Sequence, residues 1–378
     1  MEYYNPVKVL IKQGGVMDIG TILQDTFSET KSVLLVIGKK SFEKSKYYSI
    51  IHEKLAEYNV FVYRVNNSNP SIDEIYDGYN IIKKFKFEVI IAIGGGSVLD
   101  TAKIFSITRN VDLLSRDEFD KYILEGKYKE NRKRYKLIAI PTTVGTGSEV
   151  TPFAVVWDKN NKKKYSVDDI SLYPDIALLD VNLIMSLPKA QVVITALDAL
   201  SHGVEGYWAK RGNDISRIYS LISIELIIKN LELAIKNPED VRYKEKLLIA
   251  SMFAGKSISK SRTTLGHAIS YILTMKYDIP HGLAVGIILP HVYELNYHHI
   301  EEIEKLKTVL GNMDSSELKI WIKDICDLCK IETNLDYYGF KVDDIDEICK
   351  NANVIGRSDN NPIKITNDET KNIIYKIK

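Results

Sequence analysis

Four side chains with metal-binding chemistry lie in two short stretches of the sequence. Asp198 and His202 are four residues apart in "TALDALSHGVEGY", and His267 and His281 both lie in "LGHAISYILTMKYDIPHG". On a helix, residues four apart leave the same face about one turn apart, so the first pair could chelate a cation. One carboxylate and three imidazoles together suit Fe²⁺ or Zn²⁺ and leave room for a substrate oxygen.

Each of these residues also has an ordinary structural alternative. An aspartate and a histidine four apart are more often a capped or ion-paired surface couple, whereas His267 and His281 could be core or turn residues beside their neighbouring glycines. The coincidence of all four in one region favours a metal centre over these separate explanations.

A glycine-rich turn offers a place for a phosphate. The stretch "IIAIGGGSVLDTAK" reads as a strand, a turn and a helix. Gly94, Gly95 and Gly96 have no Cβ to block a phosphate, and Ser97 can cap a helix whose first amides favour an anion. We expect these residues, with Asp100, to bind a cofactor. The pattern is neither G-x-G-x-x-G nor a P-loop, so a simple tight turn is the alternative.

A second polar loop, "PTTVGTGSEV", follows the next expected strand. Its hydroxyls and open backbone amides suit the sugar, phosphate or carboxamide of a nucleotide, and they belong to Thr142, Thr143, Thr146 and Ser148. Both loops would lie at the carboxyl ends of parallel strands, where open α/β sheets bind ligands. Together they indicate a dinucleotide.

The elements that must position these groups change in kind near residue 186. Before it, apolar β-branched runs at 32–38, 60–65, 87–96 and 135–143 alternate with helical segments at 43–58, 71–85 and from Ser97, which predicts a parallel sheet covered on both faces. After it, the apolar period predicts only helices, at 190–211, 214–235, 240–260, 264–275, 282–297, 299–311, 315–330 and 342–354.

The expected architecture is therefore two domains. Residues 1–186 should form an α/β, Rossmann-like dinucleotide-binding domain, and residues 187–378 an all-helical domain that binds the metal and carries the catalysis. Pro188 marks the boundary. A ligand site is expected in the cleft between them.

Composition limits the kinds of partner. The chain has 378 residues, with 51 basic and 50 acidic side chains mixed along it, so no general attraction to nucleic acid or to a membrane surface is expected. Its apolar runs are shorter than the roughly 20 residues of a membrane span, and the N-terminus lacks the pattern of a signal peptide. We expect a cytoplasmic protein that binds a small molecule and forms a homodimer.

Cys326 and Cys329 form a C-x-x-C pair that could suggest zinc or redox chemistry. The surrounding "IWIKDICDLCKI" has helical apolar spacing, and no second pair of cysteines exists. The pair is therefore interpreted as thiols that pack a helix.

Several blocks, in this order, resemble the iron-containing, or group III, alcohol dehydrogenases over nearly the whole chain. They are "GGGSVLDTAK", "PTTVGTGSEVTPFAV", "PDIALLD", "ALDALSHGVEGY", "IPHG" followed by "LPHV", and "NNPIKIT". The resemblance implies a fold like that of dehydroquinate synthase, with a catalytic metal bound by Asp198, His202, His267 and His281. It also implies that the two loops bind the cofactor, and that Asn69 and Lys164 touch it.

One departure from the family concerns the choice of cofactor. Where NAD-preferring relatives usually carry Asp after the second strand, this chain reads "VIGKKS", with Gly38, Lys39 and Lys40. A 2′-phosphate would meet cations there instead of a carboxylate, so NADP(H) is favoured over NAD(H). The alternative is that both lysines only solvate a loop.

A second departure concerns the substrate pocket. Tyr271 stands where many relatives have a further histidine, which resembles the branch that includes phosphonoacetaldehyde reductases. Arg262, in "SRTT", could bind an anionic group through its guanidinium fork, although a surface or capping role is equally open. Proton return could run through Tyr271 or through water.

The predicted function is a metal-dependent alcohol dehydrogenase or aldehyde reductase that transfers hydride between a nicotinamide and a small aldehyde or primary alcohol. Fe²⁺ is the expected metal and Zn²⁺ an alternative. Two rivals remain open: a sugar-phosphate cyclase of the dehydroquinate synthase type, which uses the cofactor within its cycle, and a nucleotide-binding protein without catalysis.

Overall fold

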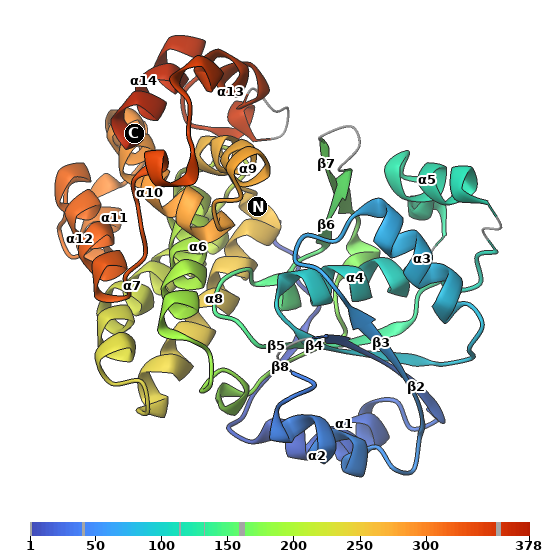
Figure 1. The fold of residues 1–378 in the computed structure, drawn as a ribbon. Helices are drawn as coiled ribbons and strands as arrows, with labels where there is room; N and C mark the ends of the chain where they lie inside the picture. The colour runs from blue at the N-terminus through green and yellow to red at the C-terminus, as the bar shows by residue number, and fades with distance from the viewer. Residues whose placement is uncertain (1, 40–41, 113–114, 132, 159–162, 353–356) are drawn as a thin grey trace. The chain divides into compact units, whose positions relative to one another are not determined.

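The computed structural model describes residues 2–39, 42–112, 115–131, 133–158, 163–352 and 357–378, without the side chain of Lys163. The chain divides into two compact units (Figure 1). The sheet unit consists of Asn5–Thr143 and Ser148–Ile184, and the helical unit of Met1–Tyr4, Val144–Gly147 and Met185–Lys378. The segment Val144–Gly147, from the middle of the second polar loop, thus packs with the helices.

The sheet unit is built on six parallel strands in the order β1-β8-β5-β4-β2-β3. This confirms the predicted parallel sheet. In chain order the strands are β1 (Lys8–Ile11), β2 (Ser32–Gly38), β3 (Asn59–Val65), β4 (Val89–Gly94), β5 (Lys136–Pro141) and β8 (Ile176–Leu179). A separate antiparallel hairpin, β6 (Phe153–Asp158) and β7 (Lys163–Asp168), was not expected from the sequence.

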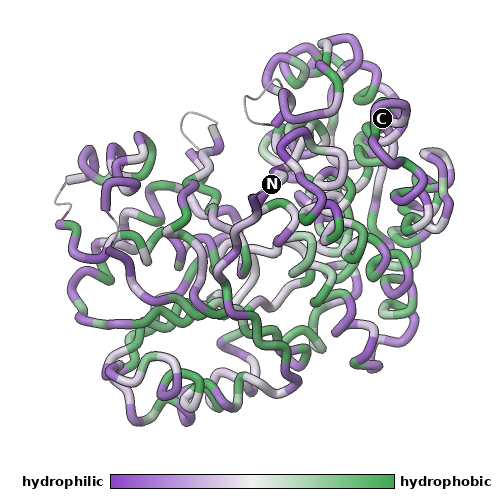
Figure 2. The backbone as a smooth tube through the Cα atoms, turned by 180° about the vertical axis from the view of Figure 1, so that it is seen from behind, coloured by the Kyte–Doolittle hydropathy of each residue, from purple (hydrophilic) through white to green (hydrophobic). Residues whose placement is uncertain are grey.

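The central strands are hydrophobic along most of their length because both faces of the sheet are buried (Figure 2). Successive side chains point to opposite faces, so Leu34 and Val36 belong to one core and Val33 and Leu35 to the other. The first core includes α3 (Ile72–Ile82), α4 (Gly96–Ser106) and α5 (Arg116–Leu124). The second includes α1 (Ile19–Thr26) and α2 (Lys46–Lys54).

The helical unit confirms the predicted all-helical region. Its first five helices are α6 (Lys189–Trp208), α7 (Asp214–Lys236), α8 (Val241–Ser261), α9 (Leu265–Tyr277) and α10 (His281–Asn296). They are followed in the described residues by α11 (Ile303–Val309), α12 (Ser315–Leu328), α13 (Ile345–Ala352) and α14 (Asn367–Ile377). No helix in the described parts of the chain is long and apolar enough to cross a membrane.

Two local signals place the helices that matter for the site. Asp278 ends α9 in the left-handed conformation, with φ of 54°, and Pro280 then occupies the N-cap of α10. His281 is therefore the first residue of its helix. The helix α6 is buried over almost its entire second half, from Ala196 to Trp208, so polar side chains there face the interior of the unit.

The two neighbouring cysteines lie on and just after α12. Cys326 is completely buried, and burial raises the pKa of its thiol to about 12. Both side chains are free thiols, and Cys329 follows the helix as its C-cap. Their place on an amphipathic helix agrees with a packing role.

Candidate metal centre and cofactor loops

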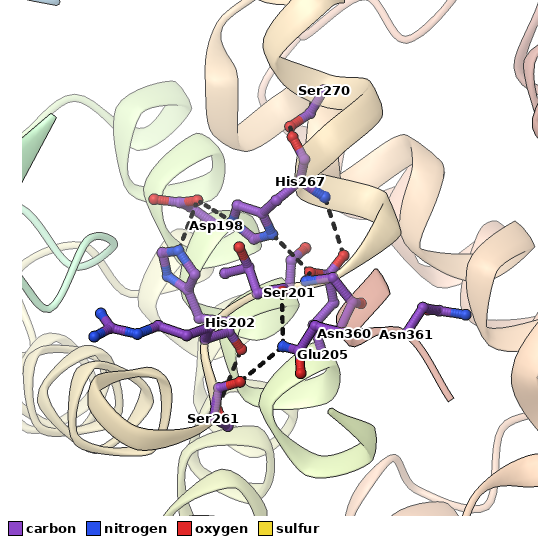
Figure 3. A network of polar contacts seen from close by, with 12 residues as sticks. Asp198, Ser201, His202, Glu205, Ser261, His267, Ser270, Asn360 and Asn361 are labelled. Carbon is purple, nitrogen blue, oxygen red and sulfur yellow. Dashed lines mark hydrogen bonds and ion pairs between the residues drawn. The ribbon is translucent and has the colours of Figure 1, made fainter. Parts of the chain in front are cut away.

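Three helices of the helical unit bring four side chains to one point. Asp198 and His202 leave the same buried face of α6, His267 lies in the first turn of α9, and His281 begins α10. The Nε2 atoms of His202, His267 and His281 lie 3.7, 3.6 and 3.8 Å from Oδ1 of Asp198. Figure 3 shows Asp198, His202 and His267 pointing toward one another.

The geometry of this cluster fits a divalent cation. The distances are longer than hydrogen bonds, and within the described residues Oδ1 of Asp198 and Nε2 of His267 are buried without a hydrogen-bond partner. Such orphaned polar atoms are rare and costly. Ligand atoms of Asp198, His267 and His281 lie within 4.8 Å of one another, as expected around one ion with bonds of about 2.0–2.2 Å.

The charge state of the cluster also suits a cation. Burial alone would raise the pKa of Asp198, but the imidazoles of His202, His267 and His281 outweigh this effect and hold it well below its ordinary value. Burial lowers the pKa of His202 to about 4. The cluster thus offers an ionised carboxylate and, at His202, a neutral imidazole, which are the protonation states that bind metals.

A second carboxylate, Glu205, orients His267. It is completely buried on α6, one turn beyond His202. Its Oε2 accepts hydrogen bonds from the backbone N–H of Thr264 (2.6 Å) and from Nδ1 of His267 (3.0 Å), and its Oε1 accepts from the backbone N–H of His267 (3.1 Å). Burial alone would lower the pKa of His267, but Glu205 and Asp198 outweigh it and raise that pKa, so a bound cation would have to replace a proton on Nε2. With Nδ1 donating to Glu205, the deprotonated Nε2 would present its lone pair on the side of Asp198.

Glu205 was not expected as a site residue, although the sequence contains a signal for it. Glu205 follows His202 by three residues, so it shares the helix face that carries Asp198 and His202. A buried carboxylate next to a metal-binding imidazole is a usual orienting partner.

Glycines allow the close packing around this centre. A Cβ at Gly282 would collide with the backbone oxygen of Ile194, and one at Gly266 with Oε1 of Glu205. In the segment Val144–Gly147, a Cβ at Gly147 would lie 2.5 Å from the Cα of Gly255. This segment also brings the carbonyl of Gly145 to 3.4 Å from Nδ1 of His202.

Tyr271 lies beside the cluster. Its ring stacks on the imidazole of His281, with centroids 4.8 Å apart and planes 9° from parallel. Arg262 directly follows α8 and adopts φ of 62° and ψ of 179°, a backbone conformation that is almost restricted to glycine. Both residues therefore belong to the same unit as the proposed ligands.

In the sheet unit, the glycine turn forms the expected junction of strand and helix. Gly94 ends β4, Gly95 is the N-cap of α4, and Gly96 and Ser97 are its first residues. A Cβ at Gly94 would meet the side chain of Val98 at 2.5 Å. The N-terminal amides of α4 thus open at the carboxyl edge of the sheet, where they can favour an anion.

The other expected cofactor residues of the sheet unit gather around this turn. The backbone N–H of Thr142 donates to the carbonyl of Gly94 (3.0 Å), and a Cβ at Gly95 would contact Thr143. Ser97 Oγ accepts from the backbone N–H of Asn69 (3.0 Å).

Asp100 anchors the second polar loop through hydrogen bonds. Its carboxylate accepts from Ser148 Oγ (2.6 Å) and from the backbone N–H of Val155 (2.9 Å). Lys164 lies on β7 with its ammonium 5.2 Å from the ring centre of Trp157. Thr146 belongs to the segment that packs with the helical unit.

Gly38 ends β2, and Lys39 directly follows it; Lys39 is exposed, and its backbone N–H donates to the carbonyl of Val65. The nearby carboxylate of Glu43 is held by Arg64 at 2.8 Å, and this hydrogen bond holds the pKa of Glu43 below its ordinary value. Lys40, the second lysine expected here, lies outside the described residues.

A sequence model described as "Iron-containing alcohol dehydrogenase" matches residues 6–181, and one described as "Fe-containing alcohol dehydrogenase family, C-terminal" matches residues 192–377. The chain therefore belongs to the iron-containing alcohol dehydrogenase family, as its sequence blocks predicted. Its fold is the dehydroquinate synthase-like fold of that family.

Individual relatives differ in length and in the activities that they are named for. An aldehyde-alcohol dehydrogenase of Streptococcus pneumoniae is 33% identical over 281 residues, which are 71% of this chain but only 31% of that protein. The NADPH-dependent butanol dehydrogenase of Clostridium saccharobutylicum is 28% identical over 357 residues, 91% of this chain and 90% of its own length.

A solved structure agrees over both units. The sulfoacetaldehyde reductase of Bifidobacterium kashiwanohense, in complex with NAD⁺, has a TM-score of 0.88 and 26% identity, and the match covers 100% of this chain and 98% of that one. This chain, by contrast, spans about a third of the length of the Streptococcus protein.

Proposed function

We propose that this protein is a metal-dependent alcohol dehydrogenase or aldehyde reductase that transfers hydride between a nicotinamide and a small aldehyde or primary alcohol. The observation that carries the proposal is the cluster of three imidazoles around one buried carboxylate oxygen. Family membership supports it over a sugar-phosphate cyclase or a protein without catalysis.

The proposed metal ligands are Asp198, His202, His267 and His281, and Fe²⁺ or Zn²⁺ fits this set. When bound, the cation would stabilise negative charge on a carbonyl oxygen while the nicotinamide supplies hydride. Glu205 keeps the proton on Nδ1 of His267, so Nε2 is the ring nitrogen that would bind the metal. Tyr271, beside His281, is the proposed hydroxyl for proton return, with water as the alternative.

We propose that the cofactor binds at the carboxyl edge of the sheet. Gly94, Gly95, Gly96 and Ser97 would hold the pyrophosphate, because their turn exposes helix amides. The remaining proposed contacts are Gly38, Lys39, Asn69, Asp100, Thr142, Thr143, Thr146, Ser148 and Lys164.

NADP(H) is the proposed preference, because Lys39 offers a cation at the end of β2 and Glu43 is already held by Arg64. Exchanging the charge in Lys39→Asp should shift the ratio of kcat/KM for NADPH over NADH toward NADH by at least tenfold. An unchanged ratio would remove Lys39 from the cofactor site.

The decisive experiment follows the absorbance of the nicotinamide. Purified protein loaded with Fe²⁺ or Zn²⁺ is expected to oxidise NADPH or NADH in the presence of short aldehydes, whereas a cyclase would give no net change. His267→Ala should abolish turnover with little change in the circular dichroism spectrum. Turnover equal to wild type in this variant would refute the proposed metal centre.

Four further expectations stay predictions. These are the division into domains at residues 186 and 187, a homodimer, a cytoplasmic location, and a phosphonoacetaldehyde-like substrate bound by Arg262. Sedimentation of the purified chain tests the dimer, and limited proteolysis near Pro188 tests the boundary.

A further inference from the structure

Arg357 lies over the ring of Tyr271, which in turn contacts the proposed metal centre. Its guanidinium carbon is 4.3 Å from the ring centre of Tyr271, and this ring in turn stacks on His281. The guanidinium carbon and the centre of the His281 ring lie 4.3 and 4.8 Å from the centre of the Tyr271 ring, so they are no farther apart than the sum of these distances. One short molecule can therefore reach both the metal centre and Arg357.

The guanidinium of Arg357 is half-buried, yet it forms no ion pair with any residue that the structure describes. The positions outside those residues contain no Asp or Glu. Arg134 and Arg217, which are also partly buried, do form ion pairs, with Asp175 at 2.7 Å and with Glu301 at 2.6 Å. A half-buried cation without a carboxylate partner is electrostatically suited to an external anion.

Stacking leaves this guanidinium able to bind an acid. The contact with the ring of Tyr271 is a cation–π contact, and it does not use the guanidinium N–H groups as hydrogen-bond donors to a polar acceptor. Two parallel N–H groups can then donate to two oxygens of a phosphonate, sulfonate or carboxylate.

The backbone that carries Arg357 is tied to the strained segment that carries Arg262. Nδ2 of the buried Asn360 donates to the carbonyls of Ser261 (2.8 Å) and Thr263 (3.0 Å), on either side of Arg262. The N–H of Asn360 also donates to the carbonyl of Arg357 (3.0 Å). A non-glycine residue is strained in the conformation of Arg262, so the surrounding structure maintains this arrangement at a cost.

We infer that Arg357 binds an acidic group of the substrate, and that the preferred substrates are short aldehydes that carry a phosphonate, sulfonate or carboxylate. The inference rests on the proposed reductase function and adds a class of substrate to it. Arg357 is then a residue that determines specificity, at the opposite end of the substrate from the reacting carbonyl.

The test compares charged and uncharged aldehydes on the metal-loaded, full-length protein. The substrates are phosphonoacetaldehyde, sulfoacetaldehyde, malonic semialdehyde and, as the uncharged control, propanal. Wild type should show the highest kcat/KM with one of the three acids, and which acid it is identifies the group. Arg357→Gln should lower that kcat/KM about 10- to 100-fold, because a pair of charge-assisted hydrogen bonds is lost. The kcat/KM for propanal should change by less than about threefold.

Matched variants separate charge from geometry. Arg357→Lys keeps the charge but loses the fork, so it should recover only part of the activity on the acid. Arg242→Gln removes an exposed arginine at the start of α8 and should leave kcat/KM unchanged for both the acid and propanal. An equal loss for the acid and for propanal in Arg357→Gln, or no loss for either, would overturn the inference.

A binding measurement decides the inference without turnover. The alcohol 2-hydroxyethylphosphonate, titrated calorimetrically, should bind wild type at least tenfold more tightly than Arg357→Gln, provided that both have the same thermal midpoint. Equal affinities overturn the role of Arg357. Reduction of propanal but of no acid would also overturn it and leave the reductase proposal standing, whereas absent nicotinamide oxidation with every aldehyde contradicts the reductase proposal itself.

Discussion

Replacing Glu205 by Gln tests whether this buried carboxylate sets the metal affinity of the centre. The carboxylate accepts three hydrogen bonds, from Thr264 N–H, His267 N–H and His267 Nδ1–H. Glutamine fills the same volume but has one accepting oxygen and one donating amide. In either orientation of the amide, its NH₂ group must face at least one donor that the carboxylate satisfied.

The expected loss has two parts. If the oxygen replaces Oε2, one buried N–H of α9 loses its acceptor, which costs roughly 1–3 kcal/mol. If the amide is reversed, Nδ1 of His267 must accept from NH₂, the ring proton moves to Nε2, and the atom that faces Asp198 no longer has a lone pair. Loss of an orienting partner of this kind typically weakens metal binding about 10- to 100-fold.

The assay is a competition titration of metal-free protein with Zn²⁺ against a chelator of known affinity. Glu205→Gln should bind Zn²⁺ about 10- to 100-fold more weakly and should unfold at a lower temperature even without metal. Glu294→Gln, on the exposed side of α10, is the matched control and should leave the affinity unchanged. Wild-type affinity in Glu205→Gln would refute the idea that this carboxylate orients a ligand.

Three further predictions concern packing, pH and the cysteines. Gly282→Ala places a Cβ against the backbone of α6 and should weaken Zn²⁺ binding more than tenfold in the same titration, by displacing the start of α10. Burial raises the pKa of Glu149 to about 7, so the folded protein keeps a proton that the unfolded chain loses above about pH 4.5, and stability falls as pH rises toward 7. The gain in thermal midpoint from Glu149→Gln should therefore be larger at pH 8 than at pH 5, and an equal gain would contradict this. Cys326→Ala should leave the metal content, measured by mass spectrometry, at one ion per chain, because the thiol is buried in α12.

The central strands could be predicted from sequence because strands buried on both faces have no polar alternation. Runs such as "SVLLVIG" and "YKLIAIPTT" are apolar over most of their length, and they contain β2 and β5. The edge strand β1 has only four residues with exposed ends, and its partner β8 lies far along the chain, at Ile176–Leu179. Neither the length nor the hydrophobic pattern of such short strands distinguishes them from loops in the sequence.

The candidate metal centre could be predicted from the sequence only in part. Asp198 and His202 are set by the helical period alone, and the structure places His267 and His281 beside them. The contact of Arg357 with Tyr271 joins residues that no local pattern connects, because it depends on the packing of α13 against α9. The strained backbone of Arg262 could not be predicted either, because no glycine in the sequence indicates the positive φ of 62° at this position.

Charge balance gives an independent reason to expect a divalent ion at this centre. Asp198 and Glu205 are 5% and 0% exposed, and in the described structure neither forms an ion pair with Lys or Arg. Two buried carboxylates without a fixed cation are costly, and hydrogen bonds from backbone and imidazole groups offset only part of that cost. A divalent ion would cancel both charges, whereas a monovalent one would leave an uncompensated charge. Chelation should therefore lower the thermal midpoint of wild type by several degrees and lower that of Asp198→Asn by less, because the variant has only one of the two charges left to compensate.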